Sequence, residues 1–307
     1  MKRILILLPV LFALFALGCS AGTSPAAYID TGVESDLAED GAWVLIPAGD
    51  FLMGQHNDRT DIDYDYEIMV TPVTNAQYVS YLNDALDDLY IEVNADNEVV
   101  GPYAGDVFHG ELHEVEIDAG DYLHLSLDDP DLRLVYEGGV FSVEEARYGN
   151  HPVTGVTWFG ANAYCEFYGW RLPSDDEWEK AARGTEGLPY PWGNEIEHNN
   201  ANFYNSKDPF EKDTGKLGTT TPVGFYNGEV HAGYQTVNSP SPYGLYDMAG
   251  NVFEWTGSIY EGTHNRYLRG GSKADYEHRL RVWVRDNARP EYYSPNAGFR
   301  SVRPVSD

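Results

Sequence analysis

Two histidines with helical spacing are the first candidates for chemistry in this sequence. His109 and His113 lie four residues apart, and imidazoles at that spacing can share a zinc ion on one face of a helix. Gly110 weakens a helix at this point, the order of residues differs from the zincin pattern, and no third ligand is evident. We therefore favour solvated histidines over a zinc site. The chain also lacks a Gly-x-Ser-x-Gly elbow, a phosphate-binding loop and a dinucleotide fingerprint.

The net charge limits the partners that this chain can bind. A formal net charge of −29 argues against a nucleic-acid partner and against adsorption to an anionic bilayer, because both need a cationic face. Solubility in a salty medium and affinity for divalent cations or basic partners both remain open. Acidic pairs such as Asp175-Asp176 and Asp128-Asp129 are interpreted as solvated surface groups.

The amino terminus has the pattern of a bacterial export signal. Two basic residues precede the apolar run from Ile4 to Gly18, which is too short to span a membrane and predicts a signal peptide over residues 1–18. Residues 16–19, Ala-Leu-Gly-Cys, resemble a lipobox in which Cys19 is acylated. Residues 19–40 would then form an acidic tether, and the protein would be lipid-anchored in the bacterial cell envelope, at the outer membrane or cell surface. Simple secretion is the second choice.

Local signals predict a domain with few regular elements. Three helices are expected: Asn75 to about Asp84 capped by Thr74, Thr157 to Gly169 capped by Thr157, and Asp175 to Arg183 capped by Ser174. Glu177 completes a capping box in the third helix. Short strands are expected at Val252–Thr256, Tyr267–Arg269, Arg279–Val284 and Gly298–Arg303. Cys165, left without a disulfide partner, is interpreted as a small buried residue of the second helix.

A long segment between the first two helices differs in character from the rest. Residues 87–150 are rich in Asp, Glu, Val and Leu, and polar and apolar residues alternate in Glu114–Ile117 and Tyr122–Leu127. Since structureless loops longer than about 15 residues are uncommon in compact domains, we expect an ordered insertion with β structure.

Many short motifs occur in a fixed order over most of the chain and carry a family resemblance. They are Ala42–Gly54, Val73–Tyr78, His151–Val153, Val156–Trp158, Gly169–Glu179, Pro191–Asn194, Ala201–Phe203, Thr221–Gly224, Tyr243–Trp255, Arg269–Ser272 and Gly298–Arg300. In this order they resemble the formylglycine-generating enzyme, or sulfatase-modifying factor, family. The resemblance implies one irregular α+β domain over residues 41–304, related to C-type lectins.

The resemblance also implies an active site that this chain lacks. The family's enzymes oxidise a cysteine of a client sulfatase with molecular oxygen, using two copper-binding cysteines shortly after the Gly-Gly-Ser turn. Asp275 and Leu280 stand at approximately these positions, and neither supplies the soft sulfur that Cu(I) requires. We therefore expect no copper and do not carry the oxidase activity over.

Calcium is the cofactor that the resemblance implies. The side chains of Asp247 and Glu254 and the carbonyl groups of Gly250 and Val252 match the family's calcium loop, and such hard oxygen ligands suit Ca²⁺.

A second calcium site would begin with Asn202 and the carbonyl group of Phe203. Its distal ligands are uncertain, because Asp213 and Leu217 lie in a segment whose spacing departs from the family. Both sites would be structural.

These observations favour a non-catalytic binding or scaffold lipoprotein with an envelope protein or a glycan as its ligand. The alternatives are a receptor diversified by a retroelement and an enzyme with altered chemistry. The residues expected to contact a ligand share one window between Arg-Gly-Gly-Ser and Gly-Phe-Arg. They are Asp275, Tyr276, His278, Asn287, Tyr292, Tyr293 and Asn296.

Overall fold

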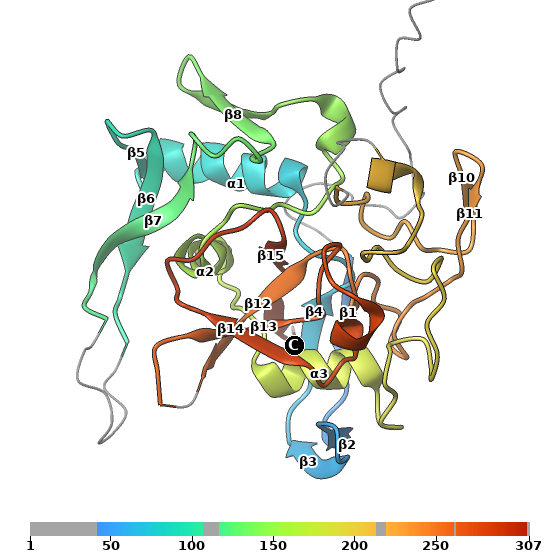
Figure 1. Ribbon diagram of the computed structural model, residues 1–307. Coiled ribbons are helices and arrows are strands. Elements are labelled where there is room, and N and C mark those ends of the chain that lie inside the picture. Colours follow the sequence, from blue (N-terminus) through green and yellow to red (C-terminus); the bar gives the residue numbers. More distant parts are fainter. Residues whose placement is uncertain (1–41, 107–116, 213–218, 261, 306–307) are drawn as a thin grey trace, which may run out of the picture.

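The computed structural model describes residues 42–106, 117–212, 219–260 and 262–305 (Figure 1). Short strands, three helices and many irregular segments form a mixed α+β domain, which confirms the expected fold class. The predicted lipidation site Cys19, the pair His109 and His113, and the residues Asp213 and Leu217 all lie outside the described residues.

Two small sheets form the centre of the domain. The larger has the order β14-β13-β12-β15, with β12 (Phe253–Ile259), β13 (Arg266–Arg269), β14 (Arg285–Ala288) and β15 (Ala297–Phe299). β15 runs parallel to β12, and the other pairings are antiparallel. The smaller has the order β1-β4-β16, with β1 (Trp43–Ile46), β4 (Tyr66–Met69) and β16 (Val302–Pro304).

The three helices begin at the predicted caps. They are α1 (Asn75–Asp87), α2 (Trp158–Phe167) and α3 (Asp175–Arg183). Thr74 and Ser174 close capping boxes with Gln77 and Glu177, and the Thr157 side chain accepts from the Gly160 N–H. Tyr78 and Leu82 of α1 are fully buried, and buried Cys165 lies 3.2 Å from the Ser301 hydroxyl, so the predicted core faces are confirmed.

The interpretation of Asp175 as a solvated surface group is wrong. Asp175 begins α3, is buried, and pairs with Arg269 (3.0 Å) and Arg285 (2.7 Å), so its charge is compensated inside the fold.

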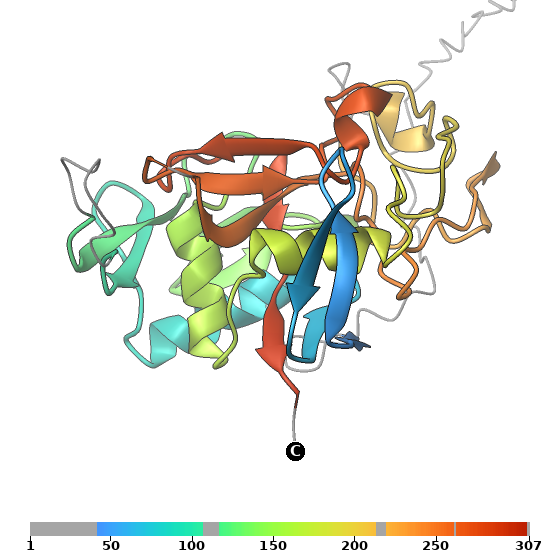
Figure 2. The same cartoon turned by 90° about the horizontal axis from the view of Figure 1, so that it is seen from below.

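The segment 87–150 contains β structure that packs on two helices. Its strands are β5 (Glu92–Val93), β6 (Glu98–Tyr103), β7 (Gly120–Ser126), β8 (Leu134–Glu137) and β9 (Val140–Val143), followed by the 3-10 helix η1 (Ala146–Tyr148). β6 and β7 pack on α2, and β9 packs on α1 (Figures 1 and 2). β7 confirms the strand predicted from the alternation at Tyr122–Leu127.

The strand predicted at Arg279–Val284 is wrong. The chain forms a 3-10 helix, η3 (Glu277–Leu280), and then an irregular segment in which the Val282 N–H donates to the carbonyl of Pro189. Leu280 and Val282 are fully buried, so their alternation reflects burial in the core without strand pairing.

The strand predicted at Gly298–Arg303 is two strands. β15 and β16 belong to different sheets and are separated at Arg300, whose side chain turns into the core.

The remaining elements are short. The hairpin of β2 (Gly49–Met53) and β3 (Asp58–Ile62) contacts α3, while β10 (Val230–His231) and β11 (Tyr234–Gln235) form a separate hairpin. The 3-10 helix η2 covers Pro209–Lys212. Within the described part of the chain, no helix has the length and apolar character needed to cross a membrane.

Candidate functional site

Asp275 and Leu280, which the resemblance places approximately at the cysteine positions, both have structural roles in the fold. The Asp275 carboxylate accepts from the Ser272 backbone N–H (3.0 Å) and hydroxyl (2.7 Å), and it pairs with Nε of Arg279 at 2.8 Å. Leu280 is fully buried in the core. Asp275 therefore shapes the loop after Gly-Gly-Ser, and Leu280 anchors it.

Two of the predicted ligand contacts belong to an aromatic surface beside this loop. The Tyr276 ring lies 4.6 Å from that of Tyr204 and is stacked with His278 at 6.4 Å between centroids. Tyr204 and Tyr276 are exposed.

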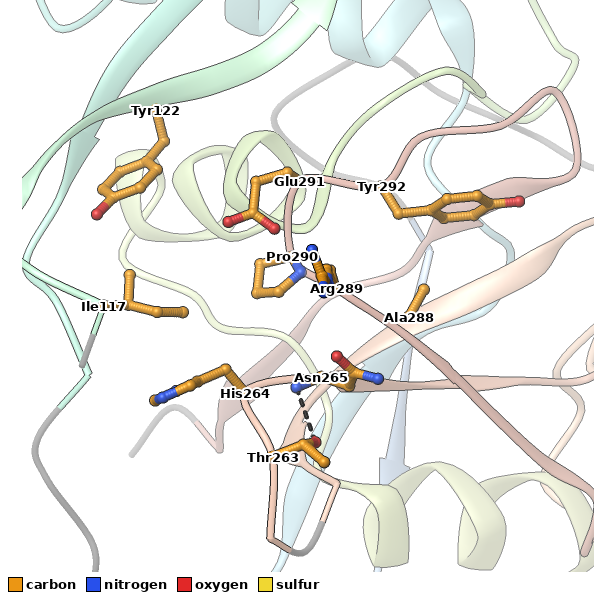
Figure 3. Close-up of a pocket in the computed structure, with 10 residues that line it drawn as sticks. All are labelled: Ile117, Tyr122, Thr263, His264, Asn265, Ala288, Arg289, Pro290, Glu291 and Tyr292. Carbon is orange, nitrogen blue, oxygen red and sulfur yellow. Dashed lines mark hydrogen bonds between the residues drawn. The ribbon is translucent and has the colours of Figure 1, made fainter. Parts of the chain in front are cut away.

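A groove between the segment 87–150 and the carboxyl-terminal loops is the candidate binding site (Figure 3). It has a larger compartment of about 1050 Å³ and a smaller one of about 300 Å³, which share Ala288 and Tyr292. The larger compartment is lined by Ile117, Tyr122, Thr263, His264, Asn265, Ala288, Arg289, Pro290, Glu291 and Tyr292. The smaller is lined by Phe253, Leu268, Asp286, Asn287, Ala288, Tyr292, Ser294, Asn296 and Ala297.

Two tyrosines from distant parts of the chain contribute aromatic walls. Tyr122 of β7 stacks on Phe159 of α2 with ring centroids 4.2 Å apart, and its hydroxyl donates to the Asp118 carbonyl. Tyr292 follows β14, packs edge-on against buried Trp255, and keeps 47% of its surface exposed. Figure 3 shows Tyr122 on the side of β7 and Tyr292 on the side of the carboxyl-terminal segment. The groove therefore depends on the docking of the segment 87–150.

An ionic cluster ties that segment to the central sheet at the edge of the groove. Asp106 lies 2.6 Å from the guanidinium of Arg266 in β13 and accepts from the Tyr103 hydroxyl at 2.5 Å. His264, in the groove wall, lies 3.4 Å from the same carboxylate. Arg266 is buried and stacks over Trp158 of α2, so the cluster joins β6, β13 and α2.

The smaller compartment combines an apolar floor with polar groups that use only part of their hydrogen-bonding capacity within the protein. Nζ of Lys273 donates to the Pro295 carbonyl (2.5 Å) and to Oδ1 of Asn296 (2.6 Å). Burial lowers the pKa of this ammonium group to about 8. Lys273 thus fixes Asn296 at the compartment wall.

The sequence identified part of this groove. Of the predicted ligand contacts, Asn287, Tyr292 and Asn296 line it, whereas Asp275, Tyr276 and His278 lie at the loop with η3, and exposed Tyr293 is outside the lining. Half of the lining residues that the sequence did not predict come from other segments, among them Ile117, Tyr122, Thr263, His264 and Asn265. No local motif marks them, because their role depends on how β7 and the start of β13 come together.

The predicted calcium loop contains the desolvated carboxylate of Asp247. Oδ2 of Asp247 accepts from the Gly224 N–H at 2.7 Å, and burial raises the pKa of this carboxyl group to about 6. Among the described residues, no cluster of three or more His, Cys, Asp or Glu side chains could hold a metal ion. A cation here would therefore depend on the backbone carbonyls of the loop as well as on Asp247, a donor set that suits calcium.

The second predicted carboxylate is engaged in a buried ion pair. Glu254 accepts from Nε (2.7 Å) and Nη2 (2.8 Å) of Arg300 and from the indole N–H of Trp178 (2.9 Å), and all three side chains are buried. A carboxylate has about four acceptor positions, so Glu254 has about one left for a metal. The sequence did not reveal this pairing, which assigns Glu254 a structural role.

Asn202, the predicted start of a second calcium site, lies against the first loop. Its carbonyl accepts from the Asn251 N–H at 2.7 Å, and its amide donates to the carbonyl of Thr219 at 3.0 Å. Gly250 has a φ of 79°, and a Cβ there would lie 2.4 Å from the Asn202 carbonyl oxygen. Glycine permits this close approach of the two segments.

The fold and the match to known sequences define a protein of the sulfatase-modifying type. A family model, the sulfatase-modifying factor enzyme 1-like domain, matches residues 32–305, and the chain belongs to this family. The inactive C-alpha-formylglycine-generating enzyme 2 of Mus musculus is 42% identical over 171 residues, covering 51% of each chain. The formylglycine-generating enzyme of Mus musculus is 30% identical over 291 residues, 84% of this chain and 73% of the relative.

Other relatives and solved structures agree with this assignment. The chain spans about half the length of the inactive enzymes, and 38% of the serine/threonine-protein kinase pkn1 of Chlamydia pneumoniae, to which it is 30% identical over 290 residues. PvdO from Pseudomonas aeruginosa has a TM-score of 0.55 at 20% identity, covering 86% of this chain and 95% of that structure. CarF has a TM-score of 0.53 at 23% identity, covering 86% and 98%. These two structures share the fold of this chain, and the family model makes it the fold of the sulfatase-modifying factor family.

Proposed function

We propose that this protein is a non-catalytic binding or scaffold lipoprotein of the bacterial cell envelope, and that the groove beside β14 is its ligand site. The observation that carries the proposal is the structural role of Asp275 and Leu280, which the family resemblance places approximately at the two cysteine positions. Asp275 is committed to Ser272 and Arg279, and Leu280 is buried in the core. The domain keeps a large groove a short distance along the chain, where aromatic walls and polar groups favour recognition.

The relationship to inactive relatives supports this proposal. The similarity to the inactive mouse enzyme covers about half of either chain. The lipid anchor at Cys19 and the envelope location rest on the amino-terminal sequence pattern. The test is whether a photo-crosslinker at position 292 captures a ligand in the native envelope, as developed in the Discussion.

A receptor diversified by a retroelement is the second candidate. It is favoured by the position of Asn287, Tyr292, Ser294 and Asn296 in the lining of one compartment, because residues varied for recognition must share a surface. A template repeat in neighbouring DNA would distinguish this receptor from a fixed scaffold. An enzyme with altered chemistry would need a reacting group other than the two family cysteines.

Calcium would stabilise this domain through the loop at Asp247, with Gly250, Val252 and Glu254, and through a second site at Asn202 and Phe203. When bound, the ion would supply positive charge to the buried Asp247 carboxylate and order the loop. Its role here is structural.

Removing calcium should lower the melting temperature of the full chain by several degrees, since a ligand that binds only the folded state stabilises it. Asp247→Ala should lower the melting temperature in calcium and abolish the further shift caused by EDTA. Thermal unfolding of the chain and the variant, each with calcium and with EDTA, measures both effects. The matched control is Asp61→Ala, at an exposed carboxylate of β3. An EDTA shift that persists in Asp247→Ala rules out this loop as the site.

A further inference from the structure

We propose that the groove beside β14 binds a neutral oligosaccharide, with the ring of Tyr292 as the platform between two saccharide subsites. This inference rests on the proposed binding function and names its ligand class. Among the described residues, Tyr292 is the only aromatic residue shared by the two compartments, and about half of its surface is exposed. A flat aromatic ring at such a position suits the apolar C–H face of a sugar ring.

The polar groups of the smaller compartment favour hydroxyl-bearing ligands. Oδ1 of Asn287 accepts a hydrogen bond from Asn265, and Oδ1 of Asn296 accepts one from Lys273. The side-chain N–H groups of both asparagines can therefore donate hydrogen bonds to a ligand. The Ser294 hydroxyl oxygen accepts from the Asn296 N–H and can still donate its proton. These donors need oxygen acceptors on the ligand.

The larger compartment supplies acceptors as well as donors. Glu291 contributes a carboxylate and Arg289 a guanidinium, and neither forms an ion pair with a described residue. Figure 3 shows both side chains between Tyr122 and Tyr292. A hydroxyl group both donates and accepts a hydrogen bond, so a ligand rich in hydroxyls can use this mixed lining over its whole length.

Charge argues against an anionic ligand. The Arg289 charge is offset by Glu291, and Arg279, the cation nearest Asp286, is already paired with Asp275 and Asp286. The Lys273 ammonium group at the wall of the smaller compartment is already engaged by the Pro295 carbonyl and by Asn296. The formal net charge of −29 would further repel phosphates and acidic polymers.

The exposed edge of β14 argues against a peptide that binds by adding a strand. The Asn287 N–H donates to Oδ1 of the neighbouring Asp286 at 2.9 Å, so this edge amide is already used within the strand. A peptide would have to displace that bond to form a ladder with β14.

The larger compartment, at about 1050 Å³, lies at the upper end of the usual size of small-molecule sites and has room for more than one sugar ring.

The test is calorimetric titration of the full chain, in calcium, with neutral oligosaccharides of two to four hexose or N-acetylhexosamine units. Saturable binding by at least one of them is expected. Tyr292→Ala should weaken that binding by about tenfold or more, as for a central aromatic contact, and Tyr292→Phe should restore most of it. Tyr204→Ala, at an exposed tyrosine outside the groove, should leave it unchanged.

Three outcomes would overturn the proposal. They are the absence of binding by any neutral oligosaccharide at millimolar concentration, binding that Tyr204→Ala and Tyr292→Ala affect equally, and a preference for uronic-acid or phosphorylated sugars. If a crosslinker at position 292 instead captures a peptide or protein, the saccharide assignment fails while the proposed binding function stands. If no ligand is found whose binding depends on Tyr292, both the saccharide assignment and the proposed binding function fail.

Discussion

Replacing Arg300 with alanine is expected to lower the free energy of unfolding by about 3–5 kcal/mol, the usual cost of removing one partner from a buried ion pair. The substitution leaves the Glu254 carboxylate without its cation in a fully buried position. It also removes hydrogen bonds to the backbone carbonyls of Met69, Val70 and Tyr246. These bonds connect β4, β12 and the loop at Asp247, so the loss affects the centre of the fold.

Chemical denaturation with and without calcium measures this effect. The matched control is Arg303→Ala, whose ion pair with Glu67 is partly exposed and should contribute about 1 kcal/mol or less. A loss in Arg300→Ala no greater than that in Arg303→Ala would contradict the structural role given to the buried pair.

Stability should also fall steeply below about pH 6.5, because two histidines are buried in their neutral form. Burial lowers the pKa of both His124 and His151 from 6.5 to about 3. His124 packs against the backbone of Gly101 and Gly160 with no hydrogen bond to either ring nitrogen. His151 contacts the Thr220 hydroxyl at 2.9 Å, and the charges of Arg133 and Arg147 further oppose its protonation.

The direction of this pH dependence follows from the linkage between proton binding and folding. Between pH 6.5 and pH 3 the unfolded chain binds a proton at each histidine that the folded chain does not bind, so the free energy of unfolding falls as the pH falls. At pH 5 each histidine should cost about 2 kcal/mol relative to neutral pH, at about 1.4 kcal/mol per pH unit. Denaturation series between pH 7.5 and pH 4.5 provide the measurement.

Comparison of variants separates the contribution of the two buried histidines to this pH dependence from the contribution of the acidic residues. His151→Gln should flatten the pH dependence, and His124→Leu should do the same if it folds. His278→Ala, at an exposed ring, should not change it. Equal slopes in all of these proteins would contradict the buried neutral histidines.

The parts of the fold that follow local rules could be predicted from the sequence. Thr74, Thr157 and Ser174 begin the three helices, since a side-chain cap depends only on residues one turn away. The strand around Tyr122–Leu127 was likewise visible from its alternation. The predicted strand at Arg279–Val284 failed because alternating burial of Leu280 and Val282 arises there without a strand partner.

The groove could be predicted only in part, because its walls come together from distant segments. Asn287, Tyr292 and Asn296 were identified within one window, but Tyr122 and His264 depend on the docking of β6 and β7 against α2 and β13. Glu254 illustrates the same limit. Its motif suggested a metal ligand, and its pairing with Arg300, 46 residues away, appears only in the fold.

The most direct test of the central claim is photo-crosslinking in the native envelope. The full chain would carry a photoreactive phenylalanine analogue at position 292 in one preparation and at position 204 in another, so that one exposed tyrosine inside the groove is compared with one outside it. We predict a discrete adduct from position 292 that disappears when an excess of unmodified chain competes for the ligand. Adducts only from position 204, or none that differ between the two positions, would contradict a binding function in this groove.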